Sequence, residues 1–495
     1  MQDIVATINS YVWSSALVYL CLGAGLFFSI MTRFVQVRQF REMIRLLTRG
    51  KASSEGISTF QALAVSLSGR VGTGNIAGVA AAIGFGGPGA VFWMWVVAFL
   101  GASTAYVESA LGQIYKEVDD GQYRGGPAFY IEKALGQKWY AWIFAMSTVL
   151  ATGFLLPGVQ ANAIGNAVDL AFGGGTLIES PFGEVSQVKL IVGSFIVLFL
   201  GIIIFGGVKR IAHFTQVVVP VMALAYVVSA LVIIVMNISV VPDIIMLIVK
   251  DAFTPMAGFG AAIGWGVKRG IYSNEAGQGT GPHAASAAEV DHPAQQGLVQ
   301  AFSVYVDTLL VCSATAFMIL ITGAYHVTGV EGAVSGGALA MTVDPNSPAF
   351  TQLAVESVVS GVGGPFVAVA LFFFAFTTLL AYYYIAETNV AYIKRTFHIP
   401  GLMLILKLGL MAAVFYGAIR TASLAWALGD IGVGLMAWLN IVGILIIFLV
   451  AKPAIKALRD YEAQKAAGVE KYRFDPQALG IKNAKFWEDR INQDK

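Results

Sequence analysis

The sequence predicts an all-α membrane protein with about eleven transmembrane helices. Of its 495 residues, 57% are hydrophobic and 12% are charged, whereas roughly 25% are charged in ordinary soluble domains. So little charge cannot cover the apolar surface in water, and a lipid bilayer is the natural solvent. Apolar stretches of the roughly 20 residues that cross a bilayer lie near 12–32, 57–85, 90–115, 139–170, 188–206, 212–236, 253–276, 297–323, 365–392, 401–419 and 426–450.

The first stretch, 12–32, is expected to be a retained membrane helix. Asp3 precedes it without any Lys or Arg, and the stretch is too long for the core of a signal peptide. A basic segment follows from Arg33 to Lys51. Because basic loops stay on the cytoplasmic side, the N-terminus is predicted to lie outside and the C-terminus inside.

Basic residues in the later loops favour the same orientation and a multi-pass protein of a bacterial inner (plasma) membrane. The loops predicted to face outside hold only Lys189, Lys250 and Arg420. The loops predicted to face the cytoplasm hold Lys116, Arg124, Lys133, Lys138, Lys209, Arg210, Lys268, Arg269, Lys394 and Arg395.

Four parts can be distinguished along the chain. Residues 1–56 hold the first helix and the basic loop, and residues 451–495 form a polar cytoplasmic tail, predicted as a helix with a frayed end. Residues 57–236 and 237–450 each hold five predicted helices, and the two sets cross the membrane in opposite senses. Two such halves form an inverted repeat, which is typical of secondary transporters.

Each half opens with a helix interrupted by glycines, at 68–78 and at 258–266. A break inside the membrane exposes C=O groups that suit a dehydrated Na+ and N–H groups that suit a carboxylate. Glycine permits such a break and lets a substrate approach the backbone. This role is predicted for Gly72, Gly74, Gly264 and Gly266, and the alternative is that these glycines serve close helix packing.

Polar residues inside membrane helices are energetically costly and tend to be functional. Asn75 follows the first break, and Gln160 lies midway along its span. Thr377 and Thr378 stand side by side, with Tyr382 one turn further. Because uncharged amides suit both ends of a zwitterion, Asn75 and Gln160 are predicted to line a substrate pocket from opposite sides.

Two charged residues at membrane depth are open to two interpretations. Arg70, beside the first break, is predicted to form a structural or gating ion pair, because an unpaired charge there is too costly. Asp307 could be its carboxylate partner, or it could serve a cation.

The sequence gives no support for an enzyme. Cys21 and Cys312 lie in apolar runs, and no nucleophile–base pair or metal-spaced set of histidines is visible. Gly72-x-Gly74-x-x-Ala77 matches a dinucleotide fingerprint but lacks the strand that such a site requires. We therefore expect a transporter with no organic cofactor and no nucleic-acid partner. The alternative functions are an amino-acid sensor or a channel on a transporter-like scaffold.

At these residues the chain resembles the alanine or glycine:cation (sodium) symporter family. The resemblance implies an extra first helix followed by a LeuT-type repeat of five plus five helices. It also implies Na+-coupled uptake of alanine, glycine or a similar small neutral amino acid by alternating access. The motifs that carry it span nearly the whole chain and are Arg70–Gly78, Gly87–Trp95, Arg124–Pro127, Gly158–Asn162, Ser273–Gly277, Asp307–Thr308 and Phe374–Thr378.

The resemblance further implies the residues of the site. Some members carry Gly-Trp where this chain has Ala381-Tyr382. Substrate contacts would come from Thr73, Gly74, Asn75, Gln160, Ile263, Gly264, Trp265, Gly266, Thr378 and Tyr382. Ligands for Na+, the only metal expected, would come from Ser68, Val71, Phe374, Thr377 and Thr378. Small residues at both breaks, with Trp265 and Tyr382 filling space, predict a pocket for a hydrogen or methyl side chain.

Overall fold

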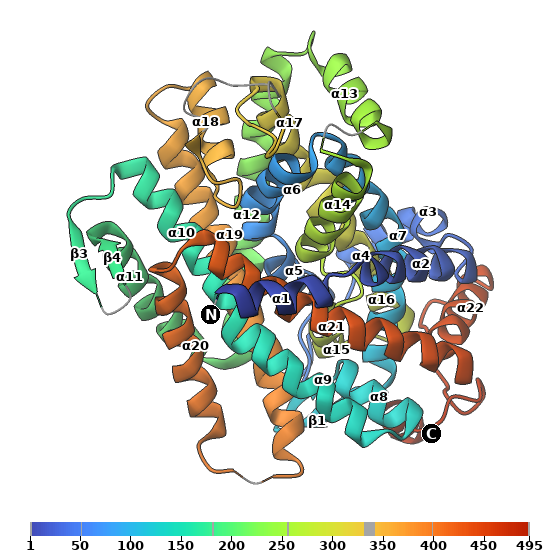
Figure 1. Ribbon diagram of the computed structural model, residues 1–495. Helices are drawn as coiled ribbons and strands as arrows, with labels where there is room; N and C mark the ends of the chain where they lie inside the picture. The colour runs from blue at the N-terminus through green and yellow to red at the C-terminus, as the bar shows by residue number, and fades with distance from the viewer. Residues whose placement is uncertain are drawn as a thin grey trace.

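The computed structural model describes residues 2–50, 52–180, 183–254, 257–330, 342–397 and 399–493. Lys51 of the predicted basic loop and residues 494 and 495 of the tail lie outside this part. The described chain is mostly helical, with two small antiparallel hairpins (Figure 1). Its elements up to residue 236 are α1 (Gln2–Val12), α2 (Ser15–Met31), α3 (Val35–Arg38), α4 (Phe40–Leu47), α5 (Thr59–Arg70), η1 (Gly74–Gly78), α6 (Val79–Gly86), α7 (Gly89–Ile114), β1 (Glu117–Asp119), β2 (Gln122–Arg124), α8 (Pro127–Leu135), α9 (Lys138–Leu150), η2 (Ala151–Leu155), α10 (Leu156–Phe172), β3 (Leu177–Ser180), β4 (Gly183–Ser186), α11 (Gln187–Ile204) and α12 (Gly207–Met236).

The second half of the chain is also helical. Here η1, η2 and η3 denote π-helical turns, which often occur at functional sites. The remaining elements are α13 (Val241–Phe253), α14 (Phe259–Asn274), α15 (Gly281–Ala287), α16 (Pro293–Val304), η3 (Tyr305–Cys312), α17 (Ser313–Thr322), α18 (Ala349–Val358), α19 (Gly363–Lys394), α20 (Leu402–Ala418), α21 (Ala422–Val450), α22 (Pro453–Ala466) and α23 (Lys485–Gln493).

The membrane architecture predicted from composition is confirmed. Two shorter apolar helices, Gly74–Gly86 and Leu402–Ala418, coincide with further predicted spans. The exact number of crossings stays a prediction. Among the described residues, eight helices are long and apolar enough to span a bilayer, namely Asp3–Met31, Gly89–Ile114, Lys138–Phe172, Gln187–Ile204, Gly207–Met236, Pro293–Thr322, Gly363–Lys394 and Ala422–Val450.

The first interrupted helix lies where the sequence predicts it. α5 begins behind a capping box formed by Ser58 and Gln61 and ends at Arg70, and Val71 leaves helical geometry at φ −78° and ψ 86°. Helical structure resumes at Gly74. The two parts of this interrupted helix pack against different neighbours. The part before the break, α5, lies against α12 and α19, and the part after it, α6, lies against α7 and α14.

The second interruption lies later in the chain than predicted. α14 continues without a break through 258–266 to Asn274, and α15 begins at Gly281. The interruption is therefore the segment 275–280. Glu275, Gly277 and Gly279 have φ values of +57°, +87° and +82°, a left-handed conformation that ends a helix and that glycine adopts most easily.

The glycines of the predicted second break belong to the interior of α14. A Cβ on Gly266 would lie 2.5 Å from the carbonyl oxygen of Ala90, so this glycine lets α14 approach α7 closely. A Cβ on Gly264 would have no heavy atom within 4 Å. The packing interpretation is thus correct for Gly266, and neither glycine interrupts the helix.

The C-terminal tail is anchored on the lower side of the molecule in Figure 1. Trp487 on α23 is 2% exposed and donates its Nε1–H to the carbonyl oxygen of Gln113 at 2.9 Å. Arg490 forms an ion pair with Glu289 at 2.8 Å. The tail therefore ends in a second packed helix, and we call this side of the molecule the tail face.

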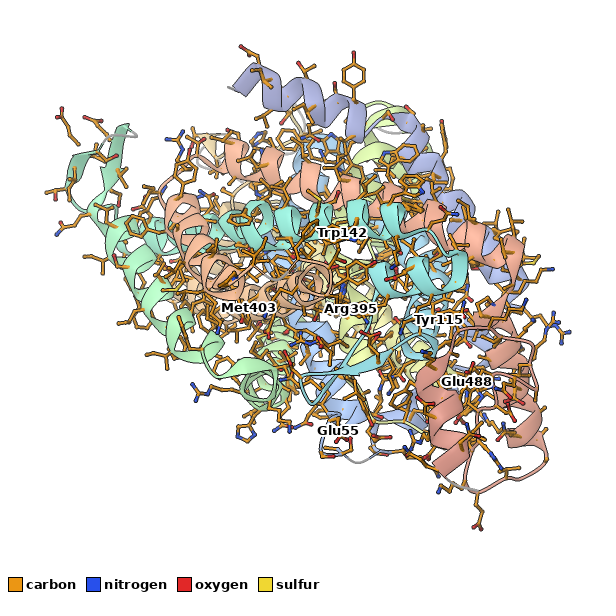
Figure 2. All side chains as sticks on the ribbon, turned by 90° about the horizontal axis from the view of Figure 1, so that it is seen from below. Glu55, Tyr115, Trp142, Arg395, Met403 and Glu488 are labelled. Carbon is orange, nitrogen blue, oxygen red and sulfur yellow. The ribbon has the colours of Figure 1, made fainter. Side chains whose placement is uncertain are left out.

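A cavity of 1390 Å³ lies on the tail face, bordered by the β1–β2 hairpin, α8 and the tail. Glu55, Trp142 and Arg395 are among its lining residues, and Figure 2 shows them from below. None of the site residues predicted from the sequence lines this cavity.

The lysine that follows α7 is buried beneath the tail, and this burial predicts a pH effect on stability. Lys116 donates to the carbonyl oxygen of Ala288 at 2.9 Å, and burial lowers its pKa to about 7. An exposed lysine has a pKa near 10.4, so between these values the unfolded chain holds a proton that the folded chain lacks. The free energy of unfolding should therefore rise from pH 7 to pH 9. Thermal denaturation in detergent should show this rise in the wild type and a smaller one in Lys116→Met.

Candidate substrate and ion site

Gln160 of α10 and Thr378 of α19 meet at the first break. Gln160 Oε1 accepts a hydrogen bond from the N–H of Thr73 at 3.0 Å. A Cβ on Gly72 would lie 2.4 Å from Thr378 Oγ1 and 3.0 Å from Gln160 Oε1. Only glycine leaves room for both side chains, so two residues predicted from the sequence do come together at the interrupted backbone.

Two tyrosines and a threonine complete this part of the site. Tyr382 of α19, which was predicted, and Tyr272 of α14, which was not, are both buried and approach Gln160. The hydroxyl of Thr73 is buried and has no hydrogen-bond partner among the described residues. A Cβ on Gly74 would lie 3.2 Å from the Tyr272 ring, so α14 packs directly on the first break.

The predicted sodium ligands are brought together only in part. Thr378 Oγ1 donates to the carbonyl oxygens of Ser68 at 2.8 Å and Phe374 at 3.0 Å. Thr377 instead donates to Phe373 and Phe374 of its own helix and contacts Met222 of α12. Val71 lies within the break, at the end of α5. The carbonyl oxygens of Ser68 and Phe374 therefore lie close together around the Thr378 hydroxyl. The Thr377 hydroxyl bonds to carbonyl oxygens of its own helix, α19.

Asn75 is held inside the protein by both ends of its amide. Its Oδ1 accepts from Gly72 N–H at 2.8 Å, and its Nδ2 donates to Asp307 Oδ1 at 2.7 Å. The side chain has no exposed surface. Asn75 thus fixes the first break to η3, whereas Gln160 reaches the break through Thr73.

The ion pairs of the described residues do not include one between Arg70 and Asp307, so the pairing of these two residues, one of the two interpretations left open, is not supported. Arg70 donates to the carbonyl oxygen of Gln300 at 3.1 Å and to Ser303 Oγ. Asp307 accepts from Ser273 at 2.9 Å and from Thr308 at 2.6 Å. Hydroxyl and amide donors stabilise this carboxylate in place of a guanidinium.

The residues Ile263, Gly264, Trp265 and Gly266 do not form a broken segment, because α14 is helical there. The Trp265 ring stacks on Phe85 of α6 at 4.6 Å between centroids. The part of α14 that contacts the first break is instead its last turn. A Cβ on Gly74 would lie 3.1 Å from Ser273 Cα in that turn. The Gly-rich pattern indicated the correct helix but not the turn that breaks.

A buried ion cluster lies between α14 and α21. Arg269 binds both oxygens of Asp430, at 2.9 and 3.1 Å, and Lys268 binds the same carboxylate at 2.7 Å. The Arg269 guanidinium lies 4.2 Å from the centre of the Trp426 ring. Placing Lys268 and Arg269 in a cytoplasmic loop was therefore wrong, since both belong to α14 and Arg269 is 1% exposed.

Glu108 of α7 accepts hydrogen bonds from the backbone of the second break. Its carboxylate accepts from the N–H groups of Gly277 at 3.2 Å and Gly279 at 3.1 Å, and from Asn440 Nδ2 at 2.7 Å. A buried carboxylate thus stabilises the N–H groups that the interrupted helix leaves free. Its position within an apolar stretch was the only sequence signal for this residue.

Two interrupted helices that meet in a membrane-embedded helical bundle define a secondary transporter of the LeuT-type fold. The crystal structure of MhsT in complex with L-phenylalanine has this fold, and it matches 81% of the chain and all of that chain at a TM-score of 0.50 and 15% identity. The model of the sodium:alanine symporter family matches residues 1–476. The chain belongs to this family, so it is a carrier and not an enzyme.

Curated relatives cover nearly the whole chain. A Bacillus subtilis protein, provisionally named a sodium/proton-dependent alanine carrier, is 58% identical over 99% of this chain and 98% of its own. The sodium/proton-dependent alanine carrier of Bacillus sp. strain PS3 is 49% identical over 90% of this chain and 97% of its own. A third relative from B. subtilis, provisionally named a sodium/glutamine symporter, is 40% identical over 94% of this chain and 92% of its own.

Proposed function

We propose that the protein is a Na+-coupled symporter that carries alanine into the cell by alternating access. Membership of the sodium:alanine symporter family supports this function. The observation that carries it is the meeting of Gln160 and Thr378 at Gly72, inside an interrupted membrane helix. Such a break offers backbone N–H groups to a carboxylate and backbone carbonyls to a cation within one small volume.

The substrate carboxylate is proposed to bind at Thr73. The N–H of Thr73 is bonded to the neutral amide of Gln160, and its hydroxyl has no partner. A carboxylate is a stronger acceptor than an amide, so it would take over the N–H and satisfy the hydroxyl. Gly74, Gln160, Thr378 and Tyr382 would then surround the substrate, and Asn75 would act indirectly through Asp307.

The sodium ion is proposed to bind between α5 and α19. The carbonyl of Ser68 and the hydroxyl of Thr378, which are in contact at 2.8 Å, would be two ligands, and Val71, Phe374 and Thr377 would complete the site. Each Na+ that moves inward gains about 2.3 kcal/mol per 100 mV of membrane potential. Since alanine is a zwitterion, uptake should be electrogenic.

Replacing Thr378 by valine should raise the Na+ concentration for half-maximal alanine uptake by about 10- to 100-fold. The expected loss is that of one hydrogen-bonding group to an ion, about 1.5–3 kcal/mol. Thr388→Val is the matched control, because Thr388 is buried on the same helix and donates to the carbonyl oxygen of Tyr384 within that helix. Uptake into proteoliposomes under a Na+ gradient measures both. A proton gradient that drives uptake equally well in Na+-free buffer would contradict Na+ coupling.

The same vesicles separate the remaining alternatives. Competition against labelled alanine by glycine, serine, leucine and glutamine tests the proposed small pocket, since one methylene is worth only about 1–3 kcal/mol. Strong competition by glutamine would replace the small pocket with a larger one. Binding of alanine without accumulation would indicate a sensor, and flux that does not saturate would indicate a channel.

The tail face is proposed to be cytoplasmic in a bacterial inner membrane, with the N-terminus outside. The support is the bias of basic residues, because Lys133, Lys138 and Arg395 lie around the tail-face cavity. Modification of a cysteine placed at Lys471 in intact cells and in inverted vesicles distinguishes the two orientations.

A further inference from the structure

Four ionisable side chains are buried together where the two interrupted helices meet. Arg70 of α5, Glu108 of α7, Glu275 of the second break and Asp307 of η3 are each at most 2% exposed. One guanidinium thus faces three carboxyl groups in the membrane interior, where unbalanced charge is costly.

Two of these carboxyl groups are fully supplied with donors. Hydrogen bonds to a carboxylate favour its charged form, so Glu108 and Asp307 are better supported as carboxylates than a group with fewer donors. The donor residues are Gly277, Gly279 and Asn440 for Glu108, and Asn75, Ser273 and Thr308 for Asp307.

Glu275 differs from both. Its Oε2 accepts one hydrogen bond, from Thr280 Oγ1 at 2.9 Å, and its Oε1 is buried with no hydrogen-bond partner in the part of the chain that the structure describes. Arg70 is the main positive charge near Glu275, but it forms no ion pair with this carboxyl among the described residues, and its guanidinium binds Gln300 and Ser303 instead. An ionised carboxyl with a bare oxygen is therefore the least stable charge in the cluster.

A small cavity adjoins Glu275 and lies between α5, α15 and α19. It measures 10 Å³ and is lined among others by Gly69, Thr280 and Tyr384. This volume holds about one water molecule. It is too small for a hydrated ion, whereas a proton on Oε1 needs no additional space.

We propose that Glu275 binds a proton during the transport cycle. In the packed arrangement seen here, a proton on Oε1 removes one of the three negative charges that face the single guanidinium and turns the carboxyl group into a donor toward the cavity. When this region opens to bulk water, the Oε1–H bond breaks, the proton passes to a water molecule and the carboxylate keeps the electron pair. The inference rests on the proposed function, because alanine binding is taken to close the site and so to drive proton uptake.

The other titratable groups around Glu275 do not replace it in this role. They are Arg70, Glu108 and Asp307, with Tyr272 on α14, His283 on α15 and Tyr382 and Tyr384 on α19. Arginine stays charged and tyrosine stays neutral near pH 7. Both ring nitrogens of His283 are engaged, with the carbonyl oxygen of Thr280 at 3.0 Å and with Asn389 at 2.8 Å.

Calorimetric titration of alanine into the purified protein tests the inference. Titrations in Na+, in buffers with different ionisation enthalpies at each of several pH values, count the protons taken up with each alanine. The wild type should take up a measurable fraction of one proton, and Glu275→Gln should bind alanine with none. Glu289→Gln, which removes a carboxyl on the tail face, should match the wild type.

A second variant keeps the test decisive if Glu275→Gln does not fold. Thr280→Val removes the only hydrogen-bond donor to Glu275 among the described residues, so the pH of half-maximal proton uptake should rise by about one unit. Wild-type protein that binds alanine without proton uptake would overturn the inference and leave the symporter intact. So would Glu275→Gln that still takes up protons, or Thr280→Val with an unchanged pH profile. Wild-type protein that does not bind alanine would overturn both proposals.

Discussion

Replacing Gly72 by alanine should lower alanine uptake by at least about 100-fold, whereas the same change at Gly264 should leave uptake intact. A Cβ on Gly72 would lie 2.4 Å from Thr378 Oγ1 and 3.0 Å from Gln160 Oε1. Either the break or both side chains must then move. In active sites, misplacement by about 1 Å can already cost about 100-fold in rate.

Gly264 is a matched control because it is also a glycine of a predicted break. A Cβ there meets no heavy atom within 4 Å, and alanine is favoured over glycine inside a helix by about 0.5–1 kcal/mol. Gly264→Ala should therefore be active and slightly more stable. Uptake of labelled alanine, normalised to the amount of protein in the vesicles, measures both variants. Inactive Gly264→Ala beside active Gly72→Ala would show that the part of α14 around Gly264, and not the break after α5, holds the substrate.

This contrast also shows what sequence reasoning can and cannot locate. The first break was predicted at the correct residues because its glycines and Asn75 follow Arg70 directly in an apolar stretch. The second was placed at 258–266 instead of 275–280. A glycine that packs against Ala90 and a glycine that bends the backbone look the same in a sequence, since the difference lies in which helix is near.

Charged residues were the second source of error. Lys268 and Arg269 looked like a cytoplasmic loop because an adjacent basic pair is usually exposed. Their partner Asp430 lies 161 residues after Arg269, and no spacing rule connects positions so far apart. For the same reason, the pairing of Asn75 with Asp307 could not be read from the order of residues. Burial and hydrogen-bond partners had to come from the fold.

Asp430→Asn should destabilise the protein by about 3–5 kcal/mol, the usual cost of removing one partner from a buried ion pair. Asp430 binds Arg269 at 2.9 Å and Lys268 at 2.7 Å, and the side chains of Asp430 and Arg269 are 3% and 1% exposed. Asparagine keeps the size of the side chain but leaves two cations without a counter-charge.

The control for this variant is Asp243→Asn, since Asp243 is exposed in the first turn of α13 and its loss should cost less than about 0.5 kcal/mol. A combined variant, Asp430→Leu with Lys268→Met and Arg269→Met, separates charge from packing. Apolar replacement of a whole buried ion pair is often neutral, so the combined variant should recover much of the lost stability. Thermal denaturation in detergent ranks the variants by melting temperature.

If Asp430→Asn melts at the same temperature as the wild type, the cluster does not stabilise the contact between α14 and α21. If the combined variant is as unstable as Asp430→Asn, the loss comes from packing around Trp426 and not from unpaired charge.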